Sequence, residues 1–191
     1  MKSAAITKVI SNRCEITNVR VQRHIFLTGF MGTGKTTVGP RLASLLGLPF
    51  LDTDRYLEAR IGKTIPQIFA RKGESFFRKE ETKLLLEFFQ KTPHVLSLGG
   101  GIILAEGNRG ILSRGIWINL KAMPATILKR VGSKKTRPLL KKKNQREIIE
   151  ELLNGRRPLY DLAPFQIETD TLSVDGVIAK IFQILKMTGV S

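Results

Sequence analysis

The sequence predicts an α/β protein: a three-layer α/β/α arrangement in which helices cover both faces of a five-stranded parallel sheet. Strand-like and helix-like segments alternate from Arg23 onward, the usual pattern of a parallel sheet with crossover helices. A glycine-rich run, Gly29–Thr36, lies between the first such strand and the first such helix. With 191 residues, 42% of them hydrophobic, the chain can bury one core, so we expect a single domain over residues 23–191.

The expected strands are short apolar runs, each followed by a segment with helical spacing of apolar residues. In sequence order they are His24–Thr28, Pro49–Asp52, His94–Leu98, Ile116–Leu120 and Phe165–Glu168. The helices that follow them are Lys35–Leu46, Thr53–Ile61, Glu106–Arg114, Pro124–Val131 and Val174–Met187. Three more expected helices exceed this minimal plan: Ile65–Arg71, Glu74–Lys91 and Gln145–Gly155.

The run Gly29–Thr36 fits G-x-x-x-x-G-K-[ST], the phosphate-binding P-loop. Its glycines let backbone N–H groups turn toward an anion, and the helix that follows adds the positive end of its dipole. Lys35 is expected to reach the β- and γ-phosphates, and the Thr36 hydroxyl to ligate Mg²⁺. The alternative is a glycine-rich turn before an ordinary helix, but a strand precedes this loop and a helix follows it. The sequence therefore predicts nucleoside triphosphate binding.

The chain is strongly basic, with 32 basic and 16 acidic residues and a formal net charge of +16. Such a balance suits either nucleic acid or small anionic ligands. Much of the excess falls in residues 1–22 and in the segment Lys129–Arg146, so it does not form a basic face across the fold. We therefore expect no nucleic-acid partner. Residues 1–22 lack a signal-peptide pattern and are expected to form a disordered basic extension.

Cysteine and hydropathy patterns indicate the compartment. Cys14 is the single cysteine, which excludes an intrachain disulfide and a Cys-based zinc site and suits a reducing cytosol. No apolar stretch approaches the length of a membrane span. We expect a cytoplasmic protein without a membrane partner, and a monomer because a small chain can hold a self-contained site.

Two carboxylates, Asp52 and Asp54, close the second expected strand. Residues two apart on an extended chain share a face, with side chains about 7 Å apart. One carboxylate can then face Mg²⁺, directly or through water, while the other orients an attacking hydroxyl and accepts its proton. The alternative is that Asp54 caps the following helix, a role compatible with catalysis.

An arginine, Arg78, lies in the opening turns of the expected helix that begins at Glu74. Alone it would be unremarkable, because it can pair with Glu74 or Glu81 on a solvated helix face. The two phenylalanines before it can pack against its stem.

Three consecutive glycines, Gly99–Gly101, end the third expected strand. They can form a tight turn or allow a ligand to approach the backbone closely. A P-loop enzyme usually has an acidic residue at the end of such a strand, and none is present here. Asp52 is therefore expected to supply the carboxylate on the magnesium side.

Two further arginines lie in the C-terminal half. Arg137 belongs to a basic segment at about 133–145 with the composition of a mobile lid, from which it could reach the phosphates. A solvated basic loop is the alternative. Arg156 stands before Pro158 in an expected turn and could present its guanidinium to a carboxylate.

Together these motifs resemble those of the shikimate kinase family, in the family's order and over about Arg23 to Met187. The P-loop alone is not specific for that family, whereas its combination with the other five motifs is. The matching segments are Gly32–Thr37, Asp52 with Asp54, Gly73–Glu81, Gly99–Gly101, Arg137–Leu140 and Arg156–Tyr160. The resemblance implies a P-loop kinase fold with substrate-binding helices at about 62–92 and a lid at about 133–145.

The resemblance also implies an activity: ATP-dependent phosphorylation of the 3-hydroxyl of shikimate, with Mg²⁺, in the biosynthesis of chorismate and aromatic amino acids. Asp54 would be the catalytic base, and Lys35 and Arg137 would stabilise the transferring phosphoryl group. The implied ATP-binding residues are Gly32, Thr33, Gly34, Lys35, Thr36, Thr37 and Arg137. The implied shikimate-binding residues are Asp54, Arg78, Gly100 and Arg156, and the implied magnesium ligands are Thr36 and, through water, Asp52.

Three other functions remain open. A gluconate kinase or another small-metabolite kinase would share the P-loop and the lid. A nucleoside monophosphate kinase would need a base-reading pocket that the compact segment Ile65–Gln90 does not suggest. A non-enzymatic P-loop module would bind nucleic acid with a strong dependence on salt. The adenine contacts stay unassigned, because no arginine suited to stack on the base lies near Thr169–Ser173.

Overall fold

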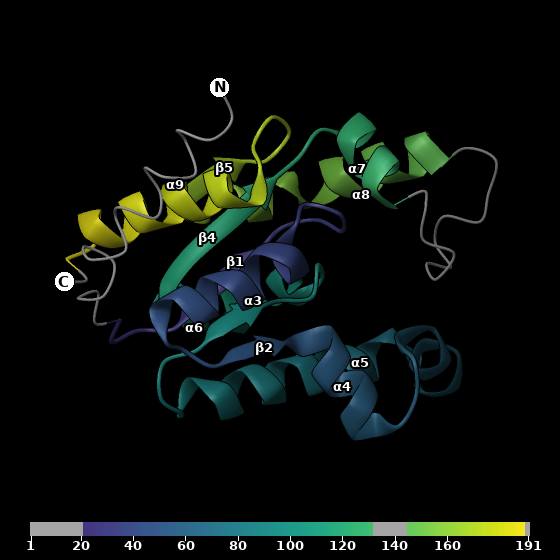
Figure 1. Cartoon of the computed structure of the whole chain (residues 1–191). Coiled ribbons are helices and arrows are strands. Elements are labelled where there is room, and N and C mark those ends of the chain that lie inside the picture. Colours follow the sequence, from purple (N-terminus) through teal and green to yellow (C-terminus); the bar gives the residue numbers. More distant parts are fainter. Residues whose placement is uncertain (1–20, 132–144, 190–191) are drawn as a thin grey trace.

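The computed structural model describes residues 21–131 and 145–189, and a parallel sheet lies at its centre (Figure 1). Its strands are β1 (Ile25–Thr28), β2 (Phe50–Asp52), β3 (Val95–Ser97), β4 (Ile116–Lys121) and β5 (Phe165–Glu168). They pair in the order β2-β3-β1-β4-β5. The five expected strands are confirmed, with ends that differ by at most one residue.

The register of the sheet aligns the strand ends. Ile25 of β1 pairs with Val95 of β3 on one side and with Ile116 of β4 on the other, and all pairs are parallel. Phe50 of β2 also pairs with Val95. All five carboxyl ends therefore meet at one edge of the sheet, where ligands bind in folds of this kind.

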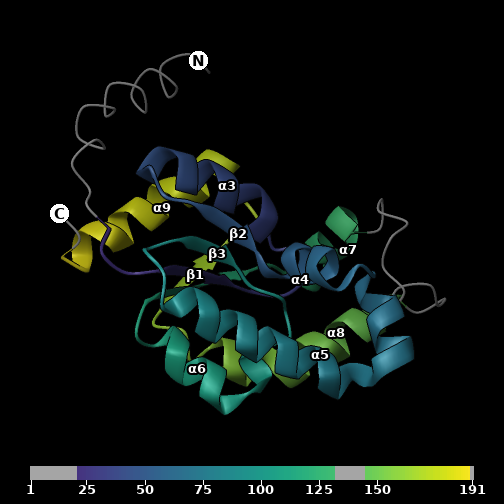
Figure 2. The same ribbon diagram turned by 90° about the horizontal axis from the view of Figure 1, so that it is seen from below.

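Helices cover both faces of the sheet, as the sequence predicts. They are α3 (Lys35–Leu46), α4 (Thr53–Ile61), α5 (Ile65–Phe89), α6 (Glu106–Leu112), α7 (Pro124–Val131), α8 (Gln145–Tyr160) and α9 (Val174–Met187), with a short 3₁₀ helix at Ile102–Leu104. Figure 2 shows α3 and α9 on one face and α5, α6 and α8 on the other. In the part of the chain that the structure describes, no helix is long and apolar enough to cross a membrane.

Each face of the sheet has its own hydrophobic core, because side chains alternate along a strand. In β1, Phe26 contributes to the core beneath α5 and α8, while Ile25 and Leu27 contribute to the core beneath α3 and α9. Val21 is also buried in the second core, so the folded part of the chain includes residues before the expected boundary at residue 23. The rest of the expected extension (1–20) and nearly all of the expected lid, including Arg137, lie outside the described residues.

The expected helices Ile65–Arg71 and Glu74–Lys91 form one element, α5, with a break in the middle. At Gly73 the backbone has φ 80° and ψ 161°, outside the helical range. A residue with a Cβ would be strained at this positive φ, which accounts for glycine at the break. The second segment of α5, which carries Arg78, therefore takes its own direction.

The C-terminal end of α8 corrects one prediction. The sequence places the end of this helix at Gly155 and a turn at Arg156–Tyr160, but the helix continues to Tyr160 with Pro158 inside it. Proline removes one N–H donor, and the carbonyl that loses its partner is that of Asn154, four residues earlier. Asn154 is exposed, so water can satisfy this carbonyl. Arg156 and Tyr160 consequently lie one helical turn apart on one face.

At the amino edge of the sheet, His24 joins β1 to the end of α5 and the start of β3. Its Nδ1 accepts a hydrogen bond from the His94 backbone N–H at 3.2 Å, and its ring stacks on Phe26 at 5.8 Å. Burial lowers the pKa of His24, and the His94 ring lowers it further, whereas hydrogen bonds with the backbone at Phe89 and Lys91 oppose the shift. The folded protein therefore favours the neutral imidazole.

This environment predicts that His24 makes the fold sensitive to acid. The folded-state pKa of His24 lies below its unfolded value of about 6.5. The neutral ring therefore contributes its full stabilisation above about pH 6.5, and this contribution is lost as the pH falls below that value. Between pH 7 and pH 5, the unfolding free energy of the wild type should decline more steeply than that of His24→Gln, by at most about 1.4 kcal/mol per pH unit. Urea denaturation at several pH values measures the difference.

His94→Gln is the comparison variant, since His94 is the other of the two histidines. It should lose less of the wild-type slope than His24→Gln does, because it removes only one of the causes that lower the His24 pKa and leaves burial, the largest, in place. Equal slopes in the wild type and His24→Gln would contradict the assignment to His24.

Candidate functional site

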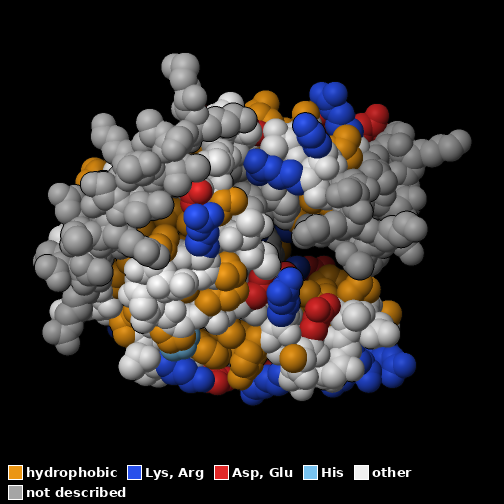
Figure 3. All heavy atoms as spheres, in the orientation of Figure 1, with side chains coloured by type: hydrophobic (Ala, Val, Ile, Leu, Met, Phe, Trp, Pro, Cys, Tyr) orange, Lys and Arg blue, Asp and Glu red, His pale blue; other side chains and the backbone are white. Residues whose placement is uncertain are grey.

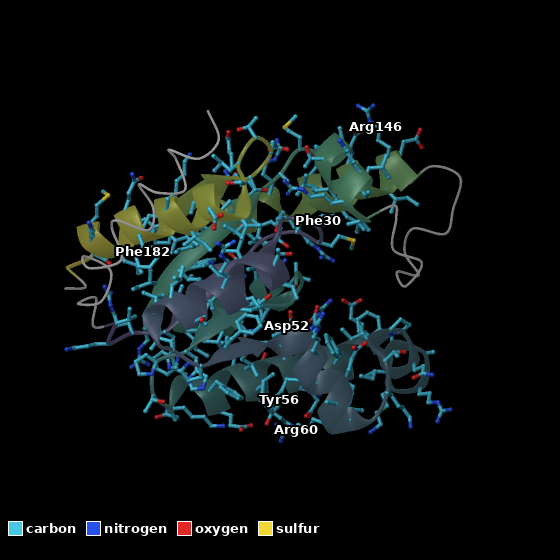
Figure 4. All side chains as sticks on the ribbon, in the orientation of Figure 1. Phe30, Asp52, Tyr56, Arg60, Arg146 and Phe182 are labelled. Atoms are coloured by element: carbon cyan, nitrogen blue, oxygen red, sulfur yellow. The ribbon has the colours of Figure 1, made fainter. Side chains whose placement is uncertain are left out.

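The P-loop connects β1 to α3 at the carboxyl edge of the sheet. Figure 4 labels Phe30 in this loop and Asp52 at the carboxyl end of β2, on the same edge. Gly29, Gly32 and Gly34 all have positive φ angles, of 139°, 81° and 104°. The loop thus takes a path that residues with side chains rarely follow, and it leads directly into the N-terminus of α3.

Side chains of the loop hold its curvature. The Lys35 ammonium donates to the carbonyl oxygens of Gly29 at 2.6 Å and Phe30 at 3.0 Å. The Thr33 hydroxyl, which is buried, donates to the same Phe30 carbonyl at 2.8 Å. These contacts within the loop hold its backbone in the curved shape.

A cavity of about 340 Å³ lies beside the P-loop. Its walls come from the P-loop with the start of α3, from the end of α7, and from the segment that joins β5 to α9. The lining residues are Gly32–Val38, Arg130, Val131, Thr169, Leu172, Val174 and Val177. The structure thus brings together all of the predicted ATP-binding residues except Arg137, which lies outside the described part of the chain.

Arg130 is the residue of this cavity that sequence reasoning missed. Its Nη1 donates to the Gly32 carbonyl at 3.2 Å and to Thr169 Oγ1 at 3.0 Å, and its Nη2 donates to the Thr169 carbonyl at 2.7 Å. An arginine thus does lie beside Thr169, and it comes from α7. Its position in the last turn of that helix, before the basic segment, was the available signal. A planar guanidinium held in this way offers a face on which a base can stack.

The two residues predicted to hold Mg²⁺, Asp52 and Thr36, lie in contact. The Thr36 hydroxyl donates to Asp52 Oδ2 at 3.2 Å. The other carboxylate oxygen, Oδ1, accepts from the Arg55 backbone N–H at 3.1 Å, which makes Asp52 the N-cap of α4. A hydroxyl and a carboxylate beside a phosphate-binding loop are the hard oxygen ligands that Mg²⁺ takes, so the residues present fit this ion.

Two expectations for Asp54 need correction. The strand ends at Asp52, so Asp54 lies in the first turn of α4 and the two carboxylates do not extend from one strand. The cap of α4 is Asp52, whose backbone is extended, and the alternative that Asp54 caps this helix is wrong. Asp54 instead lies against the end of β3: a Cβ placed on Gly99 would overlap its Oδ1.

The glycines at the end of β3 bring the predicted substrate-binding residues together. A Cβ on Gly101 would overlap the Arg78 guanidinium. A Cβ on Gly100 would lie 3.8 Å from Arg156 Nη1, and this nitrogen donates to the Gly100 carbonyl at 3.3 Å. Side chains from α4, α5 and α8 thus meet at one short stretch of backbone. Figure 3 shows this side of the molecule hollowed, with basic and acidic side chains along the lower rim.

Arg78 makes both of the ion pairs that the sequence offered as an alternative. Its Nη2 lies 2.6 Å from Glu74 Oε1, and its Nη1 lies 2.5 Å from Glu81 Oε2. The alternative of a solvated helix face does not hold for Glu81, whose side chain is only 1% exposed. Within residues 21–131 and 145–189, Glu81 Oε1 has no hydrogen-bond partner. The motif therefore places a buried carboxyl group, that of Glu81, near the partly buried Asp54.

The electrostatic environment shifts both carboxyl groups. Burial raises the pKa of Asp54 to about 6; the Asp52 carboxylate adds to this shift, and Lys35 opposes it. Burial also raises the pKa of Glu81 to about 7, against the attraction of Arg78. Both groups exchange protons near neutral pH, the range in which a general base works well.

Comparisons with known proteins agree with this geometry. The sequence profile described as SKI, shikimate kinase, matches residues 31–186. A curated shikimate kinase of Pelotomaculum thermopropionicum is 44% identical over 165 residues, which cover 86% of this chain and 96% of that protein. A solved shikimate kinase from Acinetobacter baumannii, in complex with shikimate, has a TM-score of 0.83 and 38% identity over 94% of this chain and 99% of that one.

A more distant likeness concerns one of the alternatives. A gluconokinase from Sinorhizobium meliloti has a TM-score of 0.57 and 14% identity over 88% of this chain and 94% of that one. At this level of identity the likeness shows a common fold alone.

The cavity predicts a role for Arg130 in nucleotide binding. Because its guanidinium joins the P-loop to the segment after β5, Arg130→Ala removes both a cavity wall and the link between two others. We expect the dissociation constant of MgADP to rise about 5- to 30-fold, as measured by isothermal titration calorimetry. Lys129→Ala, an exposed neighbour on the same helix, should bind as the wild type does. Equal affinities in both variants would contradict the assignment.

Proposed function

The chain belongs to the shikimate kinase family, and on that premise we propose that it transfers the γ-phosphoryl group of ATP to the 3-hydroxyl of shikimate. The products are shikimate 3-phosphate and ADP, in the biosynthesis of aromatic amino acids. The observation that carries the proposal is the meeting of Asp54, Arg78 and Arg156 at Gly99–Gly101, at the same sheet edge as the P-loop.

Two arginines bind the acceptor carboxylate in this proposal. Arg78 and Arg156 approach Gly99–Gly101 from different helices, and each can donate two parallel hydrogen bonds to a carboxylate. The pair of Arg78 with Glu74 is weak because Glu74 is 56% exposed, so the incoming carboxylate can replace it. The buried Glu81 keeps its own pair and holds the arginine in place. The Gly100 backbone lies against the ring of the acceptor.

The P-loop and the adjoining cavity bind ATP in this proposal. The loop N–H groups and Lys35 bind the β- and γ-phosphates, and Arg130 stacks on the base. Arg137 stays a prediction, as a further cation that stabilises the transferring phosphoryl group. Thr36 and, through water, Asp52 would hold Mg²⁺, which when bound neutralises negative charge on the phosphates.

Asp54 acts as the general base in this proposal. It lies close to Gly99, beside the acceptor, and its pKa of about 6 leaves it mostly ionised at neutral pH. An ionised carboxylate orients the attacking hydroxyl and accepts its proton as the bond to phosphorus forms. Shikimate then leaves as the 3-phosphate.

The domain division, the monomeric state, the cytoplasmic location and the absence of a nucleic-acid partner stay predictions. No described contact favours gluconate or a nucleoside monophosphate as acceptor over shikimate. The choice of acceptor is therefore the first experiment.

The test measures the release of ADP from MgATP in the presence of different acceptors, with a coupled enzymatic assay for ADP. Shikimate should stimulate ADP release strongly, whereas gluconate and nucleoside monophosphates should not. Stimulation by another acceptor, with shikimate inactive and MgATP shown to bind, would overturn the proposal and leave the P-loop assignment intact.

Asp54→Asn should lower kcat about 10²- to 10⁴-fold, because the amide cannot accept the proton. Its affinity for ATP should change little. In the wild type, kcat should fall on the acid side near pH 6, where Asp54 becomes protonated. Asp175→Asn, an exposed carboxylate paired with Arg41, is the control and should retain full activity. An active Asp54→Asn enzyme would remove the base from this position.

A further inference from the structure

The buried tyrosine of α8, Tyr160, touches the same carbonyl as Arg156. Its hydroxyl donates to the Gly100 carbonyl oxygen at 2.8 Å, and Arg156 Nη1 donates to that oxygen at 3.3 Å. The Tyr160 hydroxyl also interacts with the Arg156 guanidinium itself. Tyr160 is 3% exposed. A phenol, a guanidinium and one peptide oxygen thus form a closed cluster.

We propose that Tyr160 is a positioning residue for acceptor binding: it holds the Gly100 carbonyl and, through it, orients the Arg156 guanidinium toward the acceptor carboxylate. The inference rests on the proposed function, because it concerns how the shikimate carboxylate is bound. It assigns Tyr160 no contact with the acceptor.

The helix supplies the geometry. Arg156 and Tyr160 are four residues apart, so α8 places them one above the other on one face. This arrangement exists only because α8 continues past Gly155 to Tyr160. A turn after Gly155 would not place the two side chains on one helix face. The arginine has a long, flexible stem, and a fixed partner at its end, the Gly100 carbonyl, limits the orientations of its guanidinium.

The glycine run explains why the carbonyl needs to be held. The Gly100 peptide lies between residues without side chains, and a glycine backbone rotates easily between alternative directions. Rotation of this peptide would move the Gly100 carbonyl oxygen away from the Arg156 nitrogen that donates to it. Two donors from α8 oppose the rotation, and the one from Tyr160 is the shorter.

The tyrosine is suited to act as a permanent donor. Burial raises its pKa to about 12, although Arg156 and Arg78 oppose the shift. The hydroxyl therefore keeps its proton throughout the neutral range. Its ring belongs to the core beneath α5 and α8, so removal of the oxygen alone leaves the packing in place.

The test compares the full-length wild type with Tyr160→Phe and Tyr56→Phe in steady-state kinetics. Tyr56 is the other of the two tyrosines, on α4 with its ring edge-on to Phe88, and serves as the control. In Tyr160→Phe the KM for shikimate should rise about 5- to 30-fold. Its kcat and its KM for ATP should stay within about twofold of the wild type, and Tyr56→Phe should match the wild type throughout.

A second measurement shows whether Tyr160 acts through Arg156. In the Arg156→Ala background, Tyr160→Phe should change the shikimate KM by less than about twofold, since the group that it orients is gone. Equal effects of Tyr160→Phe in both backgrounds would overturn the proposal. So would an unchanged shikimate KM in the single variant, or a parallel loss of ATP affinity, which indicates a general structural defect.

The outcome is separable from that of the proposed function. A wild type without shikimate-dependent ADP release would overturn both. A wild type that is active with shikimate, together with a Tyr160→Phe variant of unchanged shikimate KM, would overturn the positioning role alone.

Discussion

The contact of charged side chains with the backbone at Gly99–Gly101 is the constraint on which the rest of the site depends. Cβ atoms at Gly99 and Gly101 would occupy the space now filled by Asp54 and Arg78. Because these positions carry no side chains, groups from helices far apart in the sequence reach one point without displacing one another. Close approach also removes water from the carboxylates, which is why burial dominates their shifted pKa values. The missing side chains at Gly99–Gly101 therefore account both for where the charged groups lie and for the shifted pKa values of the carboxyl groups.

The parallel sheet places the glycine run next to the P-loop, so the site has two adjoining parts. The pairing of β1 with β3 places the P-loop beside the glycine run, and β2, the next strand, brings Asp52 and Asp54 to the same edge. Nucleotide and acceptor sites therefore adjoin along one edge, while the aromatic contacts of His24 stabilise the opposite edge. Direct transfer between two small molecules requires such adjacency, because the attacking oxygen must lie close to the phosphorus.

The sequence was sufficient to predict the strands, the helices and the residues that meet at the site, because each motif has a strong local pattern. It failed where the outcome depends on tertiary contacts. Pro158 favours a turn after Gly155, but the carbonyl that it leaves unpaired belongs to the exposed Asn154, so the helix continues. Arg130 was hidden among neighbouring basic residues, since only the fold brings it to Thr169. The burial of Glu81 was equally invisible, because an exposed helix face and a buried one can carry the same spacing of charges.

Lys35 has a consequence for the thermodynamics of ligand capture. The Lys35 ammonium donates to the carbonyl oxygens of Gly29 and Phe30, and these hydrogen bonds stabilise the curled backbone of the loop. Because the loop's own side chains hold its backbone curled, these contacts reduce the free energy that nucleotide binding loses to ordering of the loop. On binding, the ammonium exchanges neutral oxygens for charged ones, a gain in electrostatic attraction.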